Sequence, residues 1–155
     1  MRFEIVKDEK RKFPDNEIIL PEKGTSFSAG YDIRVNEEKI LEPGQQHLFW
    51  TDIKVKLKRD EFLMIVPRSS IGVKYNLMLG NSVGIIDHDY YGNPDNDGNI
   101  GICLYNYGKI PVKVEKEMRV AQGIVVKYVR DTSDFYKKRI GGFGSTWRIF
   151  LYMVY

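Results

Sequence analysis

Ile53-Lys54-Val55-Lys56-Leu57 is the stretch that decides the fold class. Successive side chains of a β-strand point to opposite faces, so this alternation predicts a half-buried strand. Ile53, Val55 and Leu57 would face the core, and the two lysines would share the other face. Similar short runs recur along the chain, separated by Gly, Pro, Asn and Asp. Together with this stretch they predict ten strands: Phe3–Val6, Tyr31–Val35, His47–Trp50, Ile53–Leu57, Phe62–Val66, Asn76–Leu79, Val83–Ile86, Ile100–Tyr105, Val112–Val114 and Ala121–Val129.

Helix is expected only as one short turn after Arg68, where Ser69 or Ser70 can act as N-cap. No long segment keeps an apolar period of 3.6 residues, and the 14 glycines disfavour helix. Many short strands with frequent turns predict an all-β barrel or jelly roll. Two segments look like loops or mobile tracts: Asn93–Asn99 and Gly141–Thr146. The second can be a solvated linker or a loop that binds an anion through its main-chain amides.

The length and composition predict a single domain. A chain of 155 residues is long enough to bury a core. The net charge of +3 gives no bulk electrostatic case for nucleic acid. The N-terminus does not resemble a signal peptide, and no apolar run reaches the length of a membrane span. We therefore expect a cytoplasmic protein that binds neither nucleic acid nor membrane.

Gly84-Ile85-Ile86-Asp87-His88-Asp89-Tyr90 is the stretch that points to chemistry. It places acids directly after an apolar run, and burying a carboxylate is costly unless it is paired or hydrogen-bonded. An ordinary turn is the alternative explanation, because Asp is a common turn former.

The remaining reactive residues point away from covalent or cysteine–histidine metal chemistry. The single cysteine, Cys103, cannot form an internal disulfide, and its apolar surroundings predict a buried small side chain. His47 and His88 lie far apart in the sequence and are expected to face solvent. Without a Ser-His-Asp pattern of recognisable spacing, a covalent mechanism has little support.

Five segments, in order, resemble the five motifs of the trimeric dUTP pyrophosphatase (dUTPase) family. They are Ala29–Ile33 (Ala-Gly-Tyr-Asp-Ile), Pro67–Lys74 (Pro-Arg-Ser-Ser-Ile-Gly-Val-Lys), Gly80-Asn81 through Gly84–Tyr90, Arg119–Gln122 (Arg-Val-Ala-Gln), and Arg139 with Gly141–Thr146 (Gly-Gly-Phe-Gly-Ser-Thr). The resemblance implies a jelly-roll-like β-barrel that assembles as a three-fold homotrimer with active sites between subunits. It further implies a barrel domain at residues 1–138, followed at 139–155 by a C-terminal lid motif and an apolar extension.

The activity implied by the resemblance is hydrolysis of dUTP to dUMP and pyrophosphate with Mg²⁺. This reaction limits uracil incorporation into DNA and supplies dUMP for dTMP synthesis. By its match to the family, Asp87 is the general base that activates water, and Arg68 also has a catalytic role. Tyr90 would lie against the C2′ face of the sugar, where a ribose hydroxyl would clash. A turn must separate Asp87 from Tyr90, because residues three apart on a regular strand face opposite ways.

The other site residues are carried over in the same way. Asn81 would read uracil through its carboxamide, and Phe143 would stack on the base. Asp32 resembles the acid that steadies the waters of the metal, although a simple turn acid is the alternative. The phosphate contacts implied by the resemblance are Arg68, Ser69, Ser70, Gln122, Arg139, Gly144, Ser145 and Thr146.

Several features depart from the family pattern and leave alternatives open. Tyr91 stands where arginine is common, which would alter a salt bridge. The Asn93–Asn99 tract lengthens the third-motif hairpin, where it can reshape the subunit interface or bind a partner. The apolar segment Arg148–Tyr155 is expected to dock on a neighbouring subunit. Alternatives to the leading interpretation are a dCTP deaminase, a phage-type dUTPase that also binds a regulatory protein, and an inactive jelly-roll protein.

Overall fold

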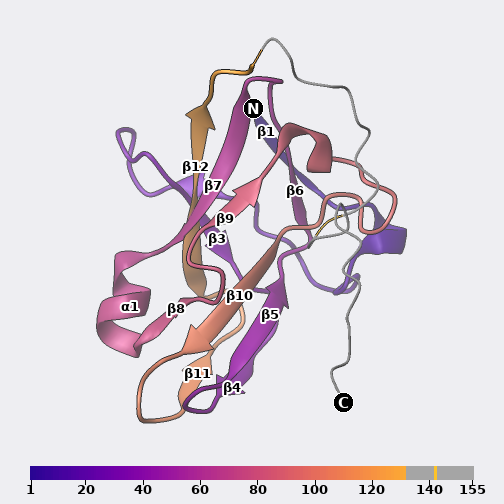
Figure 1. Cartoon of the computed structure of the whole chain (residues 1–155). Coiled ribbons are helices and arrows are strands. Elements are labelled where there is room, and N and C mark those ends of the chain that lie inside the picture. The colour runs from indigo at the N-terminus through magenta and orange to yellow at the C-terminus, as the bar shows by residue number, and fades with distance from the viewer. Residues whose placement is uncertain (132–141, 143–155) are drawn as a thin grey trace, which may run out of the picture.

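The computed structural model describes residues 1–131 and Gly142, and it shows a chain built mainly of short strands (Figure 1). The strands are β1 (Arg2–Ile5), β2 (Glu22–Lys23), β3 (Tyr31–Arg34), β4 (Lys39–Leu41), β5 (Gln46–Trp50), β6 (Ile53–Lys56), β7 (Glu61–Pro67), β8 (Leu77–Leu79), β9 (Gly84–Ile86), β10 (Gly101–Asn106), β11 (Val112–Val114) and β12 (Arg119–Lys127). One α-helix, α1 (Ser69–Tyr75), and two 3₁₀ turns, η1 (Asp8–Lys10) and η2 (His88–Tyr90), complete the described part. The predicted all-β class with at most a short helix is confirmed.

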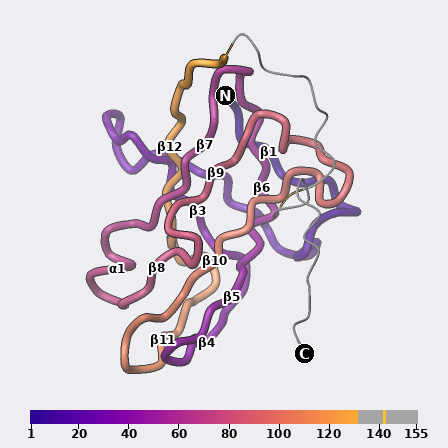
Figure 2. The backbone as a smooth tube through the Cα atoms, viewed as in Figure 1, coloured from indigo at the N-terminus to yellow at the C-terminus, as the bar shows by residue number. Residues whose placement is uncertain are grey.

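The strands of the described part pair in antiparallel fashion in four sheets. The largest has the order β2-β3-β12-β7-β9, and a three-stranded sheet has the order β5-β10-β8. Two-stranded ribbons join β1 to β6 and β4 to β11. Neighbouring strands in each sheet are often distant in the sequence, and the trace in Figure 2 shows the chain crossing between the sheets. The short strands β2 and β4 were not predicted, because neither carries an alternating apolar pattern of useful length.

One hydrophobic core holds the two larger sheets together. Leu63 and Ile65 of β7 pack in it with Phe49 of β5 and Leu104 of β10, and all four are at most 2% exposed. Burial alternates along β10, as expected for a strand with one face in the core. The face of β10 that points away from the core is therefore available to line a site.

The short helix lies where it was expected, but its cap differs from the prediction. Arg68 is the N-cap, and neither Ser69 nor Ser70 caps the helix, because both are already its first residues. Asn76 ends the helix in a left-handed conformation with φ 52°, and its N–H donates to the carbonyl of Gly72. Asparagine is one of the few residues that tolerates this conformation, so Asn76 stops the helix rather than beginning the next strand.

Strand β6 also differs from the prediction at one lysine. Ile53 and Val55 are buried as expected, whereas Lys54 is only 6% exposed and pairs with Asp97 at 2.6 Å. The residue 93–99 loop covers this lysine, and in Figures 1 and 2 the chain beyond β9 lies beside β6. The predicted loop is present, and it packs against the domain: Asn93, Asp97 and Asn99 are each 5% exposed or less.

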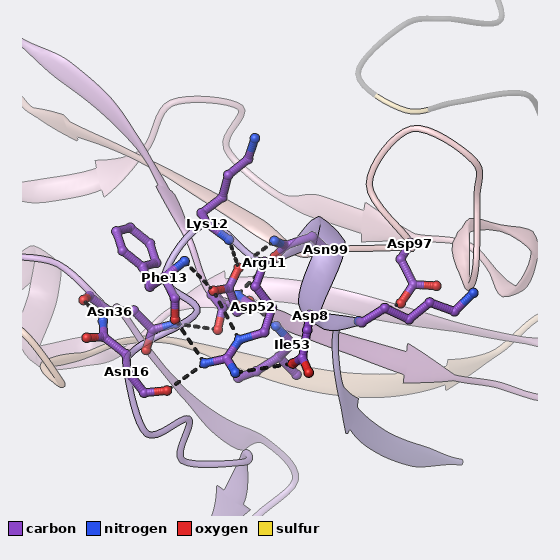
Figure 3. A network of polar contacts seen from close by, with 12 residues as sticks. Asp8, Arg11, Lys12, Phe13, Asn16, Asn36, Asp52, Ile53, Asp97 and Asn99 are labelled. Carbon is purple, nitrogen blue, oxygen red and sulfur yellow. Dashed lines mark hydrogen bonds and ion pairs between the residues drawn. The ribbon is translucent and has the colours of Figure 1, made fainter.

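A buried polar network ties the N-terminal segment to the loop between β5 and β6 (Figure 3). Asp52 is fully buried and accepts hydrogen bonds from the N–H groups of Lys12 and Phe13, each at 2.8 Å. Its main-chain N–H and side chain both bond the carboxamide of Asn99, and Arg11 lies 3.8 Å away. A buried carboxylate is tolerated when its oxygens are satisfied in this manner. The network holds the start of the chain and the end of the 93–99 loop in one place.

Candidate active site

A pocket opens between β9, β10 and the end of β7, and the Gly84–Tyr90 stretch forms much of its wall. Asn81, Asp87 and Tyr90 all line it, so the structure brings together three of the residues predicted to bind the nucleoside. Apolar side chains, including those of Ile65, Leu79, Ile86 and Ile102, contribute much of the remaining wall. Its volume of about 220 Å³ lies just below the roughly 300–1,000 Å³ typical of small-molecule sites. That size suits one ring system with a small substituent better than a whole triphosphate.

A single 3₁₀ turn explains how Asp87 and Tyr90 reach the same pocket. Asp87 ends the extended segment of β9 and is the N-cap of η2, and its carbonyl accepts from the N–H of Tyr90 at 3.1 Å. Its carboxylate does not cap the turn. The predicted turn between the two residues is therefore confirmed. Asp87 is half-buried, whereas Tyr90 is only 6% exposed.

The phenol of Tyr90 is held on both sides. Its hydroxyl donates to the carbonyl of Asn99 at 2.9 Å and accepts from Nδ2 of Asn96 at 2.8 Å. Gly142 approaches the ring from the C-terminal segment, and a Cβ there would lie 2.6 Å from Cε2 of Tyr90. Only glycine fits this close approach without a shift of the neighbouring ring.

Two residues of the pocket wall were not predicted from the sequence. Cys103 is half-exposed on the pocket wall rather than buried, which corrects the expectation for this residue. Partial burial raises the pKa of its thiol, so the thiol is protonated at neutral pH. Gly101 lines the same face of β10. The signal was present in the period of two, because Ile100, Ile102 and Leu104 alternate with these residues and are buried.

A second cluster of predicted residues lies just beyond the C-terminal end of β7. Asp32 of β3 is held by two guanidinium groups: Arg68 at 3.0 Å through one carboxylate oxygen, and Arg119 at 3.2 Å through the other. Gln122 of β12 pairs with Asp32 in the sheet register, and its side chain covers Gly30. Ser69 and Ser70 follow Arg68 at the start of α1. The cluster joins the first, second and fourth of the five sequence motifs, and Arg119 was not foreseen as the second partner of Asp32.

Asp87 of the pocket and Arg68 of the second cluster lie far apart along β7. In the β7–β9 pairing Leu63 lies opposite Ile86, so the register carried one residue further sets Asp87 beside Phe62. Arg68 is six residues further along β7 than Phe62, which corresponds to roughly 20 Å at about 3.3 Å per residue. Figure 1 shows the same arrangement, with α1 at one end of β7 and the exit of β9 toward the other. Within one chain, Asp87 and Arg68 are thus separated along the direction of β7.

Comparison with known proteins identifies the family. A family model described as dUTPase matches residues 16–147. The chain belongs to the dUTPase family. The deoxyuridine 5′-triphosphate nucleotidohydrolase of Lactococcus lactis subsp. lactis is 39% identical over 147 residues, covering 93% of this chain and 95% of the relative. That of Alkaliphilus metalliredigens is 37% identical, covering 82% and 88%.

Solved structures agree with the family assignment. The dUTPase from Streptococcus mutans matches with a TM-score of 0.74 at 34% identity, covering 84% of this chain and 98% of that one. A dUTPase from phage phi11 of S. aureus matches with a TM-score of 0.67 at 20% identity, covering 93% and 97%, and shows the shared fold alone. The predicted dUTPase-type β fold is thereby confirmed.

The remaining predictions concern the two histidines and residues that lie outside the described part of the chain. His88 is exposed as expected, but its Nδ1 lies 2.8 Å from the carbonyl of Leu57. His47 is half-buried and bonds Glu37 at 3.0 Å, so it is not a solvent-facing side chain. Residues of the predicted lid that lie outside the described part are Arg139, Phe143, Gly144, Ser145 and Thr146. The predicted domain boundary at 138/139 and the Arg148–Tyr155 extension lie there too. Within the described part of the chain, no helix has the length and apolar character needed to cross a membrane.

Proposed function

We propose that this protein is a dUTP diphosphatase, which hydrolyses dUTP to dUMP and pyrophosphate by attack of water on the α-phosphorus. The observation that carries the proposal is the meeting of Asp87, Tyr90 and Asn81 in one pocket of a dUTPase-family chain. Its relatives in Lactococcus and Alkaliphilus are named deoxyuridine 5′-triphosphate nucleotidohydrolases. The physiological consequence is a cytoplasmic activity that removes dUTP before uracil enters DNA and supplies dUMP for dTMP synthesis.

Asp87 is the proposed general base. Water is a weak nucleophile at neutral pH, and a positioned carboxylate that takes its proton contributes typically about 10²–10⁴-fold in rate. The half-buried position of Asp87 on the wall of a largely apolar pocket suits this role. Arg68 is the proposed catalytic cation, which stabilises the negative charge that develops on the phosphate oxygens.

The pocket supports selection of a deoxyuridine moiety. Asn81 lies at its edge and offers both a donor and an acceptor to the base. A site that pairs with one polar edge rejects a mismatched edge strongly, because its own groups would lose their partners. Cytosine would be excluded in this way and thymine by the bulk of its methyl group, while the buried ring of Tyr90 faces the sugar.

The phosphate-binding groups come from a neighbouring copy in this proposal. Ser69, Ser70, Gln122 and Arg68 stand together at the far end of β7 from Asp87, which supports the homotrimer with sites between subunits. Arginine suits the role because its planar fork engages two phosphate oxygens. The lid residues Arg139, Phe143, Gly144, Ser145 and Thr146 would complete the enclosure.

Magnesium is the proposed cofactor, and the donor set fits a metal carried by the nucleotide. Mg²⁺ keeps several waters and prefers phosphate oxygens with few protein ligands. Among the described residues there is no cluster of three or more metal-ligating side chains. Asp32 presents one carboxylate already bonded to two arginines, which suits a contact through water. A bound Mg²⁺ would reduce the charge of the triphosphate. A phage phi11 relative, which shares only the fold, is described as coordinating a structural Mg(II) ion.

The alternatives have weaker support. No described feature favours a dCTP deaminase over the family to which the chain belongs. Binding of a regulatory partner was one of two possibilities raised for the 93–99 loop. Asn93, Asp97 and Asn99 of this loop are buried, so its inward-facing side does not support such a partner.

A nucleotide panel tests the proposal. Purified protein with Mg²⁺ is incubated separately with dUTP, dCTP, dTTP and UTP, and pyrophosphate and ammonia are measured. Pyrophosphate from dUTP alone is expected, whereas ammonia from dCTP would overturn the proposal. Asp87→Asn should lower turnover about 10²–10⁴-fold while dUMP still binds. Asp89→Asn is the matched control, since Asp89 is exposed and lies outside the described pocket wall.

A further inference from the structure

The 93–99 loop contacts Tyr90 at both its side chain and its main chain. Asn96 donates to the phenol oxygen at 2.8 Å, and the phenol donates to the carbonyl of Asn99 at 2.9 Å. Asn93 donates to the main-chain carbonyl of Tyr90 at 3.1 Å. Both the proton and a lone pair of the hydroxyl are therefore engaged by residues of one loop.

The loop is closed by its own side chains, which makes it a firm support. Oδ1 of Asn96 accepts from Nδ2 of Asn93 at 2.7 Å and from the N–H of Gly98 at 3.0 Å. Gly98 has φ +85°, and a Cβ there would lie 2.7 Å from the carbonyl oxygen of Tyr90. Glycine is thus required where the loop packs on the main chain of the tyrosine.

The far side of the loop is anchored in the body of the domain. Asp97 accepts from Nζ of Lys54 at 2.6 Å and from the N–H of Lys7 at 2.9 Å. Asn99 is bonded to the buried Asp52, and Figure 3 shows Asp97 and Asn99 beside the N-terminal segment. The hydrogen bonds run without a break from β6 and the N-terminus, through the loop, to the ring in the pocket.

We propose that Asn96 is a positioning residue that fixes the ring of Tyr90 and thereby sets the preference for deoxyribose over ribose. The proposal rests on the proposed function, in which this ring lies against the C2′ face of the sugar. Exclusion of one hydroxyl by contact requires a wall that does not move. A ring held only by packing can shift to admit the extra oxygen, whereas one with its hydroxyl bonded twice cannot do so without breaking a bond.

The test measures nucleotide binding, so it does not depend on hydrolysis. Dissociation constants for dUMP and UMP are determined by calorimetry for the natural protein, Asn96→Asp and Asn96→Ala. The aspartate keeps the acceptor for Asn93 and Gly98 but cannot donate to the phenol. The ratio of the UMP constant to the dUMP constant should fall about 2- to 10-fold in both variants, the range expected for one lost hydrogen bond.

The matched control is Asn16→Ala. Asn16 is also half-buried, donates to the carbonyl of Asn36 at 2.8 Å and accepts from Lys116 at 3.0 Å, so its removal costs comparable contacts away from the pocket. The ratio of the UMP constant to the dUMP constant should stay unchanged in this variant. A merely structural role for Asn96 would weaken both nucleotides equally and leave the ratio unaltered, and that result would overturn the proposal.

A double-mutant cycle locates the effect. In a Tyr90→Phe background, Asn96→Asp should cause no further change in the ratio, because the hydroxyl through which it acts is gone; an additive effect would contradict the proposal. Crystal structures of the nucleotide-free variants give an independent reading, and an unmoved Tyr90 ring in both Asn96 variants would also refute it. Failure of the proposed function can be told apart from failure of the Asn96 proposal, because in the first case the natural protein would release no pyrophosphate from dUTP.

Discussion

Mixing two inactive variants should restore activity if each site is shared between copies of the chain. The perturbations are Asp87→Asn, which removes the proposed base, and Arg68→Ala, which removes the proposed phosphate contact. The β7–β9 register separates these residues by roughly 20 Å along the strand within one chain. The proposed shared site therefore assigns the Asp87 and the Arg68 that act on one nucleotide to different subunits.

The expected recovery follows from this geometry. A site in a mixed assembly works only when the copy that supplies Asp87 and the copy that supplies Arg68 are each intact at that position. With equal amounts of the two variants and random assembly, each condition holds for half of the subunits. About one quarter of the sites should therefore be complete, and pyrophosphate release should recover to about a quarter of the natural rate.

The assay is co-refolding from urea, followed by measurement of pyrophosphate release from dUTP. Each variant refolded alone gives the baseline, and circular dichroism checks that both regain the fold. A mixture no more active than that baseline would show that Asp87 and Arg68 act within one chain, and it would refute the shared site. As a control, the natural chain mixed equally with the double variant should give about a quarter of full activity for shared sites and about half for sites within one chain.

Three other measurements test separate features of the structure. Alkylation of Cys103, the single cysteine, should be slowed by dUMP because the thiol lines the pocket, and equal rates with and without dUMP would place the nucleotide elsewhere. The alkylation rate should also rise as pH rises toward and above the ordinary thiol pKa of 9.0, since burial raises the pKa of this thiol. Asp52→Ala removes the acceptor of three donors, each of which bonds the carboxylate at 2.8 Å. Urea denaturation should show a loss of about 3–5 kcal/mol in the free energy of unfolding, and a loss below 1 kcal/mol would contradict the buried network. Tyr91→Phe removes a 2.6 Å hydrogen bond to Glu4 that lowers the pKa of Glu4 below 4.5 and raises that of Tyr91 above 10.0. Its cost of about 1 kcal/mol should therefore be present at neutral pH, shrink as pH falls through the Glu4 pKa and shrink again above pH 10, and a cost independent of pH would argue against this bond.

Much of the fold could be predicted from local pattern. The alternation of Ile53, Val55 and Leu57 placed these side chains in the core, and the structure buries all three. Position-specific turn chemistry was less predictable. The helix after Arg68 was expected, but the hydroxyl groups of Ser69 and Ser70 do not cap it, because the helix begins one residue earlier than a serine cap requires.

The residues of the candidate site were also only partly predictable from the sequence. The resemblance to the third motif identified Asp87, Tyr90 and Asn81 as a group, and all three line the pocket. One 3₁₀ turn brings Asp87 and Tyr90 to it, as expected. Cys103 was missed because its neighbours suggested a buried strand, and only the pairing of β10 shows that its face forms the pocket wall.

Local sequence therefore determined most of the strands, the turn at Asp87 and the residue types available for chemistry, since these depend on periodicity and on neighbours in the chain. Tertiary structure alone decided where Lys54 lies: the alternating pattern assigned it to the polar face, yet the 93–99 loop covers it and Asp97 neutralises it. It also decided that Arg68 and Asp87 stand at opposite ends of β7. Both outcomes depend on contacts between residues far apart in the sequence, and the energy of such contacts depends on which segments meet in space.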